Sequence, residues 1–435
     1  MKRHIKLLLV LGIMLVGSFS FYLFKDYKKD ALVYENNKIK PSSSGIAMML
    51  ETSAGSGNYE MTTRSEWPTD GYVFNANLSK CENGSELSWD NENKKVLMSG
   101  NISDKCYVYF DVYVPTIADV CSSGSNLASC IKTYSNKGSS ITNIYYHDAN
   151  LTNGAGDNSY RFAGASSSVN NYVCFGSTQS PCPADNLYRI IGVFGDRVKL
   201  IKSDYATTAL LGTDGDYSKM YTDTGLDDGS NYKGNDLANI AGYTWNYKNN
   251  TTINNGYGSN TWSTSLLNKT NLNKNFITNI GADWAAKIAD TTWKVGGNTW
   301  ANIELQPAKT AYQNEIVNPV TRYSTDNKKE YSAKIGLMYA SDYGFAAAPS
   351  AWTANLSTYN GEAIKNANWM YMGLYEWTIS RCADKAFRVF NVHYTGDVDY
   401  SIAEVAFGVR PVFYLSSSVN YASGSGTAAD PILVN

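Results

Sequence analysis

The sequence has little histidine and no excess of positive charge, and these two shortages narrow the range of functions. Three histidines occur in 435 residues, which leaves few ligands for a zinc site. Basic residues number 37 against 39 acidic ones, so no basic face for nucleic acid is expected. No P-loop, dinucleotide-binding fingerprint or G-x-S-x-G turn stands out. Nucleic-acid binding, nucleotide chemistry and serine hydrolysis are therefore not indicated.

Tyrosine, in contrast, is abundant, with 33 residues in a chain that is also rich in Asn, Ser and Thr. Charged residues make up 17% of the sequence and apolar residues 43%, unlike disordered chains of high net charge. The tyrosine and asparagine reflect either an A- and T-rich genome or a selected binding surface. We predict a mostly β fold with an α+β C-terminal domain and long polar loops.

The N-terminus carries an uncharged apolar run, residues 7–24, after the cationic start MKRHIK. The run is long enough to span a membrane, and no A-x-A cleavage site follows it. We therefore expect residues 1–24 to be an uncleaved signal anchor and residues 25–45 a polar stalk. The C-terminal region would then lie outside the cell on a single-pass membrane protein. A cleaved signal peptide, which would make the protein secreted, is the alternative.

Six of the seven cysteines fall into pairs that are close in sequence, which is typical of disulfides in exported proteins. No pair has C-x-x-C spacing, so zinc is the less favoured interpretation. The predicted pairs are Cys81 with Cys106, Cys121 with Cys130, and Cys174 with Cys182.

Patterning divides the exported part into three segments. Residues 46–113 alternate polar and apolar positions between turn residues, which predicts a small β-sandwich, with WDNENKKV as one hairpin. Residues 114–170 are interpreted as a helical and looped connector. Residues 171–435 form the second domain, which opens with a hairpin that turns at Gly195 and Asp196.

Within that second domain, residues 261–290 have apolar positions at helical spacing, which predicts helix. The stretch KIGLMYASDYGFA is expected to form a strand and a turn. Late strands are expected in residues 368–380, 386–392 and 405–415 and at the C-terminus.

An acidic loop, residues 212–229, raises the question of calcium. It lacks the spacing of an EF-hand, although carboxylate-rich loops suit a hard cation. A Ca²⁺ site and a solvated acidic loop are the two interpretations, and no other cofactor is predicted. The candidate ligands are Asp214, Asp216, Asp227 and Asp228.

The seventh cysteine, Cys382, stands beside Arg381 and near Lys385. Neighbouring cations can lower the pKa of a thiol and activate it as a nucleophile. A nucleophile also needs a base within reach, and His393 is the one candidate. The alternative, which we favour, is a small and partly buried thiol.

The late segment resembles a known fold. Trp377, the A-F-x-V stretch at 386–389, the turn at Gly396 and the strand GVRPVFYL at 408–415 are similar to the core of the C-type-lectin-like fold, in its formylglycine-generating-enzyme branch. The opening hairpin, WSTSLLNKTNLN and the module WPTDGYVFNANLSKCENG…DKCYVYFD make the whole chain resemble uncharacterised exported proteins, anchored in the membrane, of low-GC Gram-positive bacteria.

This resemblance implies a ligand-facing sheet. The branch contains oxidative enzymes, sugar binders, adhesins and variable receptor-binding proteins, and fold alone does not decide among them. The oxidative members need a cysteine pair or a histidine cluster, and Cys382 has no late partner. The receptor-binding members vary their side chains between the Trp strand and the last strand. The matching positions here, beside Ser380, are Arg381, Asp384, Arg388, Asn391, His393, Tyr394, Asp397 and Tyr400.

We therefore expect a surface protein for recognition or adhesion, which binds an extracellular glycan or protein without catalysis. Tyr, Asn and Ser make a suitable binding surface, because they combine rigid area with adaptable hydrogen bonds. An exported enzyme acting on glycan or cell-wall substrates is one alternative, and a structural envelope component is another.

Overall fold

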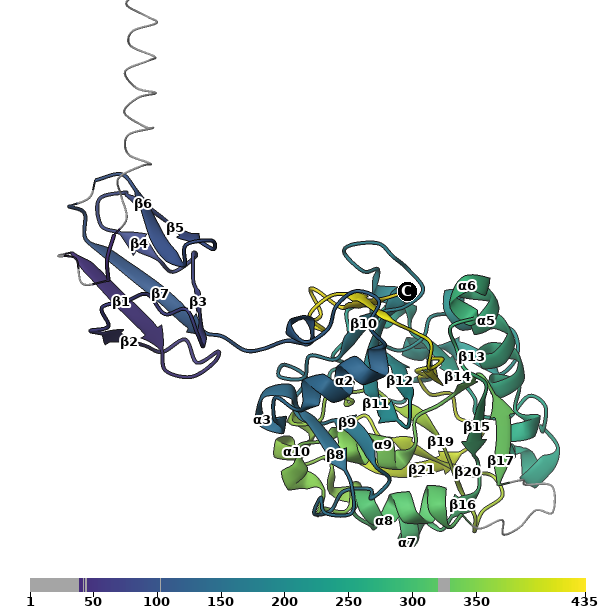
Figure 1. Cartoon of the computed structure of the whole chain (residues 1–435). Coiled ribbons are helices and arrows are strands. Elements are labelled where there is room, and N and C mark those ends of the chain that lie inside the picture. Colours follow the sequence, from purple (N-terminus) through teal and green to yellow (C-terminus); the bar gives the residue numbers. More distant parts are fainter. Residues whose placement is uncertain (1–38, 42, 44, 102, 320–328) are drawn as a thin grey trace, which may run out of the picture. The chain divides into compact units, whose positions relative to one another are not determined.

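The computed structural model describes residues 39–41, 43, 45–101, 103–319 and 329–435. The predicted signal anchor lies outside these residues, as does most of the predicted stalk. In the part that is described, no helix is long and apolar enough to cross a membrane. Strand exceeds helix, which confirms the mostly β prediction. The chain divides after Val114 into two compact units, which are described separately below (Figure 1).

The first unit is built from a twisted sheet and a separate hairpin. In the sheet, strands are ordered β2-β1-β7-β3, β4 also pairs with β7, and β1 runs parallel to β7. Strands β5 and β6 form the hairpin expected around WDNENKKV. Its Val96 and Met98 pack with Val108 and Phe110 of β7 in one buried cluster. The strands are β1 (Ile46–Glu51), β2 (Tyr59–Thr62), β3 (Tyr72–Phe74), β4 (Lys80–Cys81), β5 (Glu86–Asp90), β6 (Lys95–Ser99) and β7 (Cys106–Val112).

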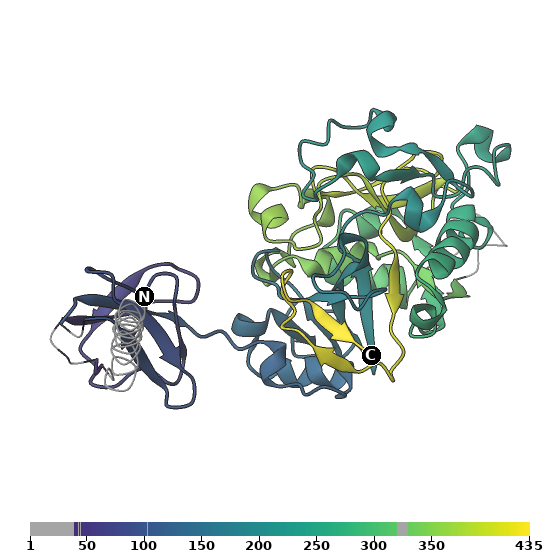
Figure 2. The same cartoon turned by 90° about the horizontal axis from the view of Figure 1, so that it is seen from above.

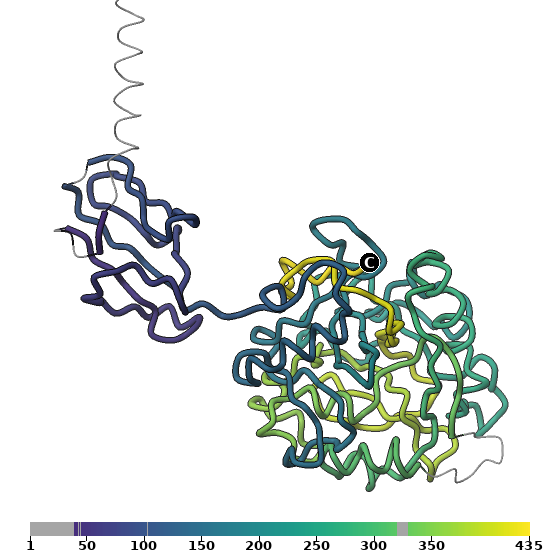
Figure 3. The backbone as a smooth tube through the Cα atoms, in the orientation of Figure 1, coloured from purple at the N-terminus to yellow at the C-terminus, as the bar shows by residue number. Residues whose placement is uncertain are grey.

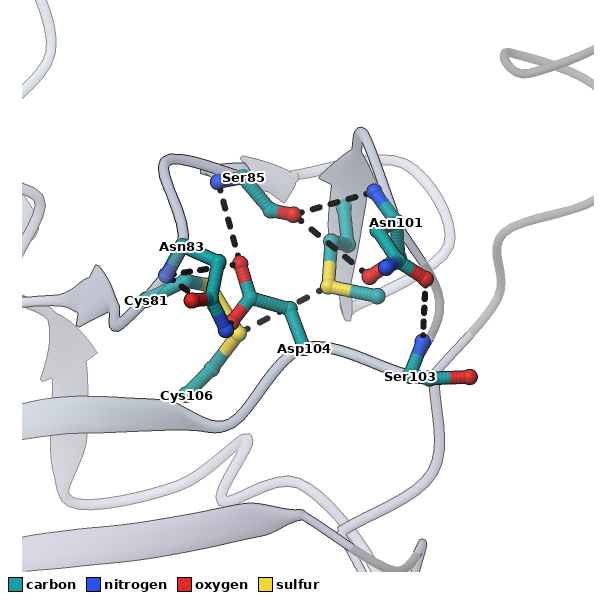
Figure 4. Close-up of a disulfide and its surroundings, with 8 residues drawn as sticks. Cys81, Asn83, Ser85, Asn101, Ser103, Asp104 and Cys106 are labelled. Carbon is teal, nitrogen blue, oxygen red and sulfur yellow. Dashed lines mark hydrogen bonds between the residues drawn. A yellow bond between two sulfur atoms is a disulfide. The ribbon is translucent and has the colours of Figure 1, made fainter.

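The Cys81–Cys106 disulfide joins β4 to β7 at the position where the two cysteines pair directly (Figure 4). Beside it, the buried Asp104 carboxylate accepts hydrogen bonds from the backbone N–H groups of Asn83 and Ser85. The side-chain amide of Asn83 donates to the same carboxylate. One buried anion therefore holds the turn that follows β4, since each of these donors would otherwise lack a protein partner.

The second unit contains two larger sheets and two small ladders. The main sheet has the order β18-β22-β12-β11-β10-β24-β23, with β9 pairing to β11 and β8 to β9. A second sheet has the order β16-β19-β20-β21, and β13-β14 and β15-β17 are two-stranded. The C-terminal hairpin β23–β24 lies beside β10, through parallel pairing of β24 (Figure 2).

The strands of this unit are β8 (Ile144–His147), β9 (Ser159–Phe162), β10 (Tyr172–Cys174), β11 (Leu187–Phe194), β12 (Arg197–Lys202), β13 (Tyr217–Met220), β14 (Ala241–Tyr243), β15 (Thr291–Lys294), β16 (Gly297–Asn298), β17 (Glu330–Ala333), β18 (Ile335–Gly336), β19 (Glu376–Cys382), β20 (Arg388–Val392), β21 (Val398–Ile402), β22 (Val412–Tyr414), β23 (Tyr421–Ser423) and β24 (Ile432–Val434).

Its α-helices are short. They are α2 (Leu127–Ser135), α3 (Ser139–Thr142), α4 (Thr208–Leu211), α5 (Ile277–Asn279), α6 (Ala282–Ala285), α7 (Trp300–Ile303), α8 (Ala308–Tyr312), α9 (Ala340–Ala346) and α10 (Glu362–Asn366). Two π-helical stretches cover Leu267–Phe276 and Gln313–Val317. Single 3-10 turns occupy Ile117–Asp119, Ala184–Asn186, Tyr221–Thr224, Leu237–Asn239, Ile253–Gly256, Trp262–Thr264, Pro349–Ala351 and Leu356–Thr358.

The opening hairpin of this unit forms as predicted, from β11 and β12. Gly195 at the turn has a φ of 63°, a conformation that glycine adopts without strain. At Gly192 the strand is bulged, and a β-carbon there would meet the Tyr160 carbonyl oxygen at 2.3 Å. Glycine at this position therefore lets β9 pair with the same strand.

The segment interpreted as a connector packs as part of the second unit. Residues 115–170 run along that unit in Figure 3, and they supply β8 and β9 to the main sheet. Helix α2 contacts β11 and β12. Its residues Leu127 and Ile131 are buried in the same hydrophobic core as those strands.

The helix predicted in residues 261–290 is confirmed, in the π form over Leu267–Phe276. Asn side chains tie this stretch to its neighbours: Asn271 Nδ2 donates to the Leu211 carbonyl and Asn273 Nδ2 to the Ile335 carbonyl. One local prediction in this unit needs correction. The stretch expected to be a strand and turn contains helix α9. Its N-terminal Asp342 accepts from the backbone N–H of Tyr339, which stabilises the first turn.

Candidate functional site

The residues predicted to form a ligand-facing sheet lie on β19, β20, β21 and their connections. Strand β19 is buried along its whole length. Arg381 has only 2% of its surface exposed, and its Nε donates to the Val295 carbonyl at 2.9 Å. Asn391 on β20 is fully buried and donates to Ser401. The expectation of one shared exposed face is therefore wrong for these two residues.

Arg388 and Tyr400 do come together at the surface of this sheet. Both side chains are half-buried, and the Arg388 guanidinium carbon lies 4.6 Å from the centre of the Tyr400 ring. Such a cation–π contact between adjacent strands orders both side chains. Asp384 lies apart from this pair in the turn after β19, where its Oδ1 is buried and has no hydrogen-bond partner among the described residues.

Three further predicted residues, His393, Tyr394 and Asp397, lie in the turn that joins β20 to β21. We call residues 393–397 the His393 turn. The turn is closed by the backbone N–H of His393 donating to the Asp397 carbonyl at 2.8 Å, and by Gly396 N–H donating back to His393. Gly396 has a φ of 108°, which a residue with a side chain would adopt only under strain.

Two buried tyrosines donate hydrogen bonds to backbone carbonyls of the His393 turn. The Tyr343 hydroxyl, from α9, donates to the Gly396 carbonyl at 2.6 Å. The Tyr371 hydroxyl donates to the Tyr394 carbonyl at 2.8 Å. The backbone of the turn is therefore fixed by side chains from outside the sheet, so its half-buried side chains are presented in a set arrangement.

A chain of hydrogen bonds runs across the His393 turn to Tyr375. The Thr395 hydroxyl donates to Asp397 Oδ1 at 2.5 Å and lies 2.6 Å from His393 Nδ1, which also accepts from the backbone N–H of Thr395 at 3.3 Å. On the other side of the ring, His393 Nε2 lies 2.7 Å from the Tyr375 hydroxyl.

Tyr375 is a site residue that the sequence patterns did not indicate. Its ring stacks on Phe407 at 4.7 Å between centroids and lies 5.3 Å from Tyr394. Burial, with the neighbouring Tyr394, raises its pKa to about 12. Tyr375 therefore stays a neutral phenol and a hydrogen-bond donor rather than an activated phenolate. The signal available in the sequence was a tyrosine two residues before Trp377, on a stretch already expected to be a strand.

Glu304, immediately after α7, is the second residue missed. Burial raises the pKa of its carboxyl to about 7, and the charges of Asp399 and Asp397 add to the effect. Its Oε2 is buried without a hydrogen-bond partner in the described chain. An acidic side chain of this kind can hold its proton near neutral pH.

Cys382 does not behave as an activated nucleophile. It is 1% exposed, and burial raises the pKa of its thiol well above the usual range, with the Asp384 charge acting in the same direction. Arg388 acts to lower this pKa but burial outweighs it, so the favoured interpretation of a small buried thiol is confirmed. The Arg381 side chain is turned to the Val295 carbonyl instead.

The other six cysteines form the three predicted disulfides, Cys81–Cys106, Cys121–Cys130 and Cys174–Cys182. Such bonds persist in oxidising compartments, which fits an extracellular environment.

The four aspartates considered for calcium are engaged in other contacts. Within the described residues, no group of three or more His, Cys, Asp or Glu side chains is placed to hold a metal ion. Asp216 is fully buried, and its carboxylate accepts from the backbone N–H groups of Leu266, Leu267 and Lys248. The others bond to nearby groups: Asp214 to Asn275, Asp227 to Tyr221, and Asp228 to Ser230.

Comparison with protein-family models, with curated proteins and with solved structures finds no match for this chain.

Proposed function

We propose that the second unit recognises an extracellular glycan or protein through the His393 turn, without catalysing a reaction. The observation that carries this proposal is the fixed presentation of polar and aromatic side chains on the turn. Tyr343 and Tyr371 hold its backbone, and Tyr375 holds the imidazole of His393. A surface whose side chains are ordered before binding loses less entropy on association.

The chemistry of the turn suits a ligand rich in hydrogen-bonding groups. Tyr394 offers ring area and a hydroxyl, and Asp397 offers carboxylate oxygens. Farther along the strands β20 and β21 that the turn joins, Arg388 and Tyr400 offer a cation and a second ring. Binding surfaces of other proteins combine aromatic rings with adaptable polar groups in the same way, which supports binding rather than catalysis here. The C-type-lectin-like resemblance and the membrane anchorage belong to the same proposal, and they rest on the sequence features given above.

A hydrolase acting on glycans or cell-wall material is the second candidate, and Glu304 is the observation that favours it. A carboxyl whose pKa is raised to about 7 has the character of a general acid. The nearby charges belong to Asp399 and Asp397.

Arrays of glycans and extracellular proteins test both candidates with the full-length chain. We expect a reproducible ligand that is retained intact, and we expect His393→Ala to weaken its binding because Tyr375 and Thr395 lose their shared partner. Absence of binding to every array component would contradict the recognition proposal. Loss of an arrayed glycan over time that Glu304→Gln abolishes would favour the hydrolase instead.

A further inference from the structure

A cluster of ionisable groups lies in the core of the second unit, away from the His393 turn. It comprises Arg161 on β9, Lys199 on β12, Asp342 at the start of α9, and Glu315. Each has at most 2% of its surface exposed. Lys199 Nζ lies 2.5 Å from Asp342 Oδ2, and Arg161 Nη1 lies 3.3 Å from Asp342 Oδ1. Arg161 Nη2 forms a second ion pair, with Asp157 Oδ2 at 2.6 Å.

The surroundings of Lys199 are unusual for an ammonium group. Besides Asp342, four aromatic rings lie close to it, with centroids between 4.7 and 5.8 Å from Nζ. Among the described residues, Asp342 provides the one hydrogen-bond acceptor for a group with three hydrogens. Burying such a charge is costly, and burial lowers the pKa of Lys199. The rings belong to Phe194, Trp293, Tyr339 and Tyr414.

The Asp342 carboxyl is held so that its two oxygens differ. Oδ1 faces the Arg161 guanidinium, which can stabilise negative charge that develops on this oxygen. Oδ2 faces Lys199 and also accepts from the backbone N–H of Tyr339 at 3.0 Å. The amine is therefore fixed against one carboxyl in a site without competing nucleophiles among its described contacts, and such fixed proximity strongly favours reaction between two groups.

Glu315 is a second buried acid at the same end of α9 as Asp342. Its oxygens accept from the backbone N–H groups of Ala340 and Ser341 and from the Ser380 hydroxyl. Burial raises its pKa to about 7, and the charge of Asp342 adds to the effect. Its own charge also acts on Lys199, so it belongs to the electrostatic surroundings of the Lys199–Asp342 pair.

From this geometry we propose that Lys199 and Asp342 condense into an intramolecular amide bond. The bond between Nζ and Cγ forms, and the bond between Cγ and Oδ2 breaks. Oδ2 leaves as water with two of the three ammonium hydrogens, and the third stays on the amide nitrogen. Both protons pass directly from Nζ to Oδ2, because these two atoms are 2.5 Å apart. One positive and one negative charge disappear together, and no oxidant or other reactant is required.

The product would join β12 covalently to α9, across 143 residues of sequence. Formation of the bond removes two charges from an apolar site, where burying them is costly. This favours the amide, whereas in water the separate carboxylate and ammonium are the more stable state. The proposal concerns the durability of the second unit, and it does not depend on the ligand of the His393 turn.

Peptide mapping of the full-length protein tests the bond directly. The protein is reduced, denatured and digested with trypsin, and the peptides are weighed by mass spectrometry. We expect a branched peptide in which residues 198–202 are joined to residues 335–365, with a mass one water below the sum of the two. Cleavage after Lys199 is absent from this species because its side chain is acylated. Separate, unmodified peptides with cleavage after Lys199 in the wild-type protein would overturn the proposal.

Variants separate the roles of the acids. Asp342→Ala removes the electrophile and is expected to give linear peptides alone, while Asp157→Asn, a change in the same cluster, keeps the branched peptide. A branched peptide that persists in Asp342→Ala would overturn the assignment of the carboxyl. Because the wild-type protein alone decides whether the bond exists, a variant that fails to fold does not affect that result.

Discussion

The Glu304 carboxyl shows how burial and nearby negative charges raise the pKa of a single residue. Its pKa is raised from 4.5 to about 7, mainly by burial and then by Asp399 and Asp397. A carboxyl whose folded pKa is raised favours the folded state below its unfolded pKa, where it is protonated in both states. That contribution is lost as the pH rises from about 4.5 through 7, because the folded protein must then give up its proton.

Replacing this carboxyl should therefore change stability in a pH-dependent way. We expect Glu304→Gln to be more stable than the wild type at pH 8, with a much smaller difference at pH 4.5. Chemical denaturation at the two pH values measures the effect, with Glu404→Gln of the same unit as control. An equal gain at both pH values would contradict the raised pKa.

At the same scale, the sequence could identify several polar residues of the site but not their exposure. His393, Tyr394 and Asp397 are predicted through the family resemblance, as positions between the Trp377 strand and the last strand. The same resemblance wrongly predicts a ligand-facing position for Arg381 on β19 and for Asn391 on β20, because all of β19 and most of β20 are buried. A strand buried on both faces lacks the alternation that separates inner from outer positions. Tyr375 and Glu304 depend on contacts from distant segments, which a local pattern does not contain.

Among the structural elements, those defined by local signals were predictable. The β11–β12 and β5–β6 hairpins follow from alternation and turn residues, and the disulfides follow from cysteine spacing. Helix α9 was missed because all seven of its residues are buried, so it has no polar face to reveal a helical period. Strand β21 was also missed, since its short run VDYSI is mostly polar and half-buried.

The start of the π-helical stretch Leu267–Phe276 is held by the buried side chain of Asp216. Asp216 accepts hydrogen bonds from Leu266 and Leu267 through Oδ2, and from Tyr247 and Lys248 through Oδ1. An amide at this position would turn an NH₂ group toward backbone donors. Charge-assisted hydrogen bonds are the stronger class, and a buried donor left without a partner is costly.

We therefore expect Asp216→Asn to lower the free energy of unfolding by about 3 kcal/mol, the sum of one charged hydrogen bond and one unsatisfied donor. Urea denaturation measures this loss, with the exposed Asp228→Asn as the matched control. We also expect added Ca²⁺ to leave the wild-type melting temperature unchanged. A calcium-dependent rise that Asp216→Asn abolishes would restore the metal interpretation of this loop.

At the scale of the whole molecule, the described residues form two units with separate cores. The core of the first unit includes Val108 and Phe110, and that of the second includes Trp377 and Phe413. Each unit also has its own disulfides. Units with separate cores commonly unfold as separate cooperative transitions.

Removing one disulfide should accordingly weaken one unit alone. We expect calorimetry to show two transitions, and the double change Cys81→Ser with Cys106→Ser to destabilise one of them by about 3 kcal/mol. The matched change of Cys174 and Cys182 should affect the other transition. A shift of both transitions by either pair would show that the units unfold together.

Recognition through the His393 turn is the central claim, and the dissociation constant of a Tyr394→Ser variant tests it most directly. Tyr394 belongs to the turn, whereas Tyr146, on β8 of the same unit, is 42% exposed and serves as the matched control. For the ligand found on the arrays, we expect Tyr394→Ser to weaken binding at least tenfold, about 1.4 kcal/mol, and Tyr146→Ser to leave it unchanged. Equal affinities for the wild type and Tyr394→Ser would contradict the claim.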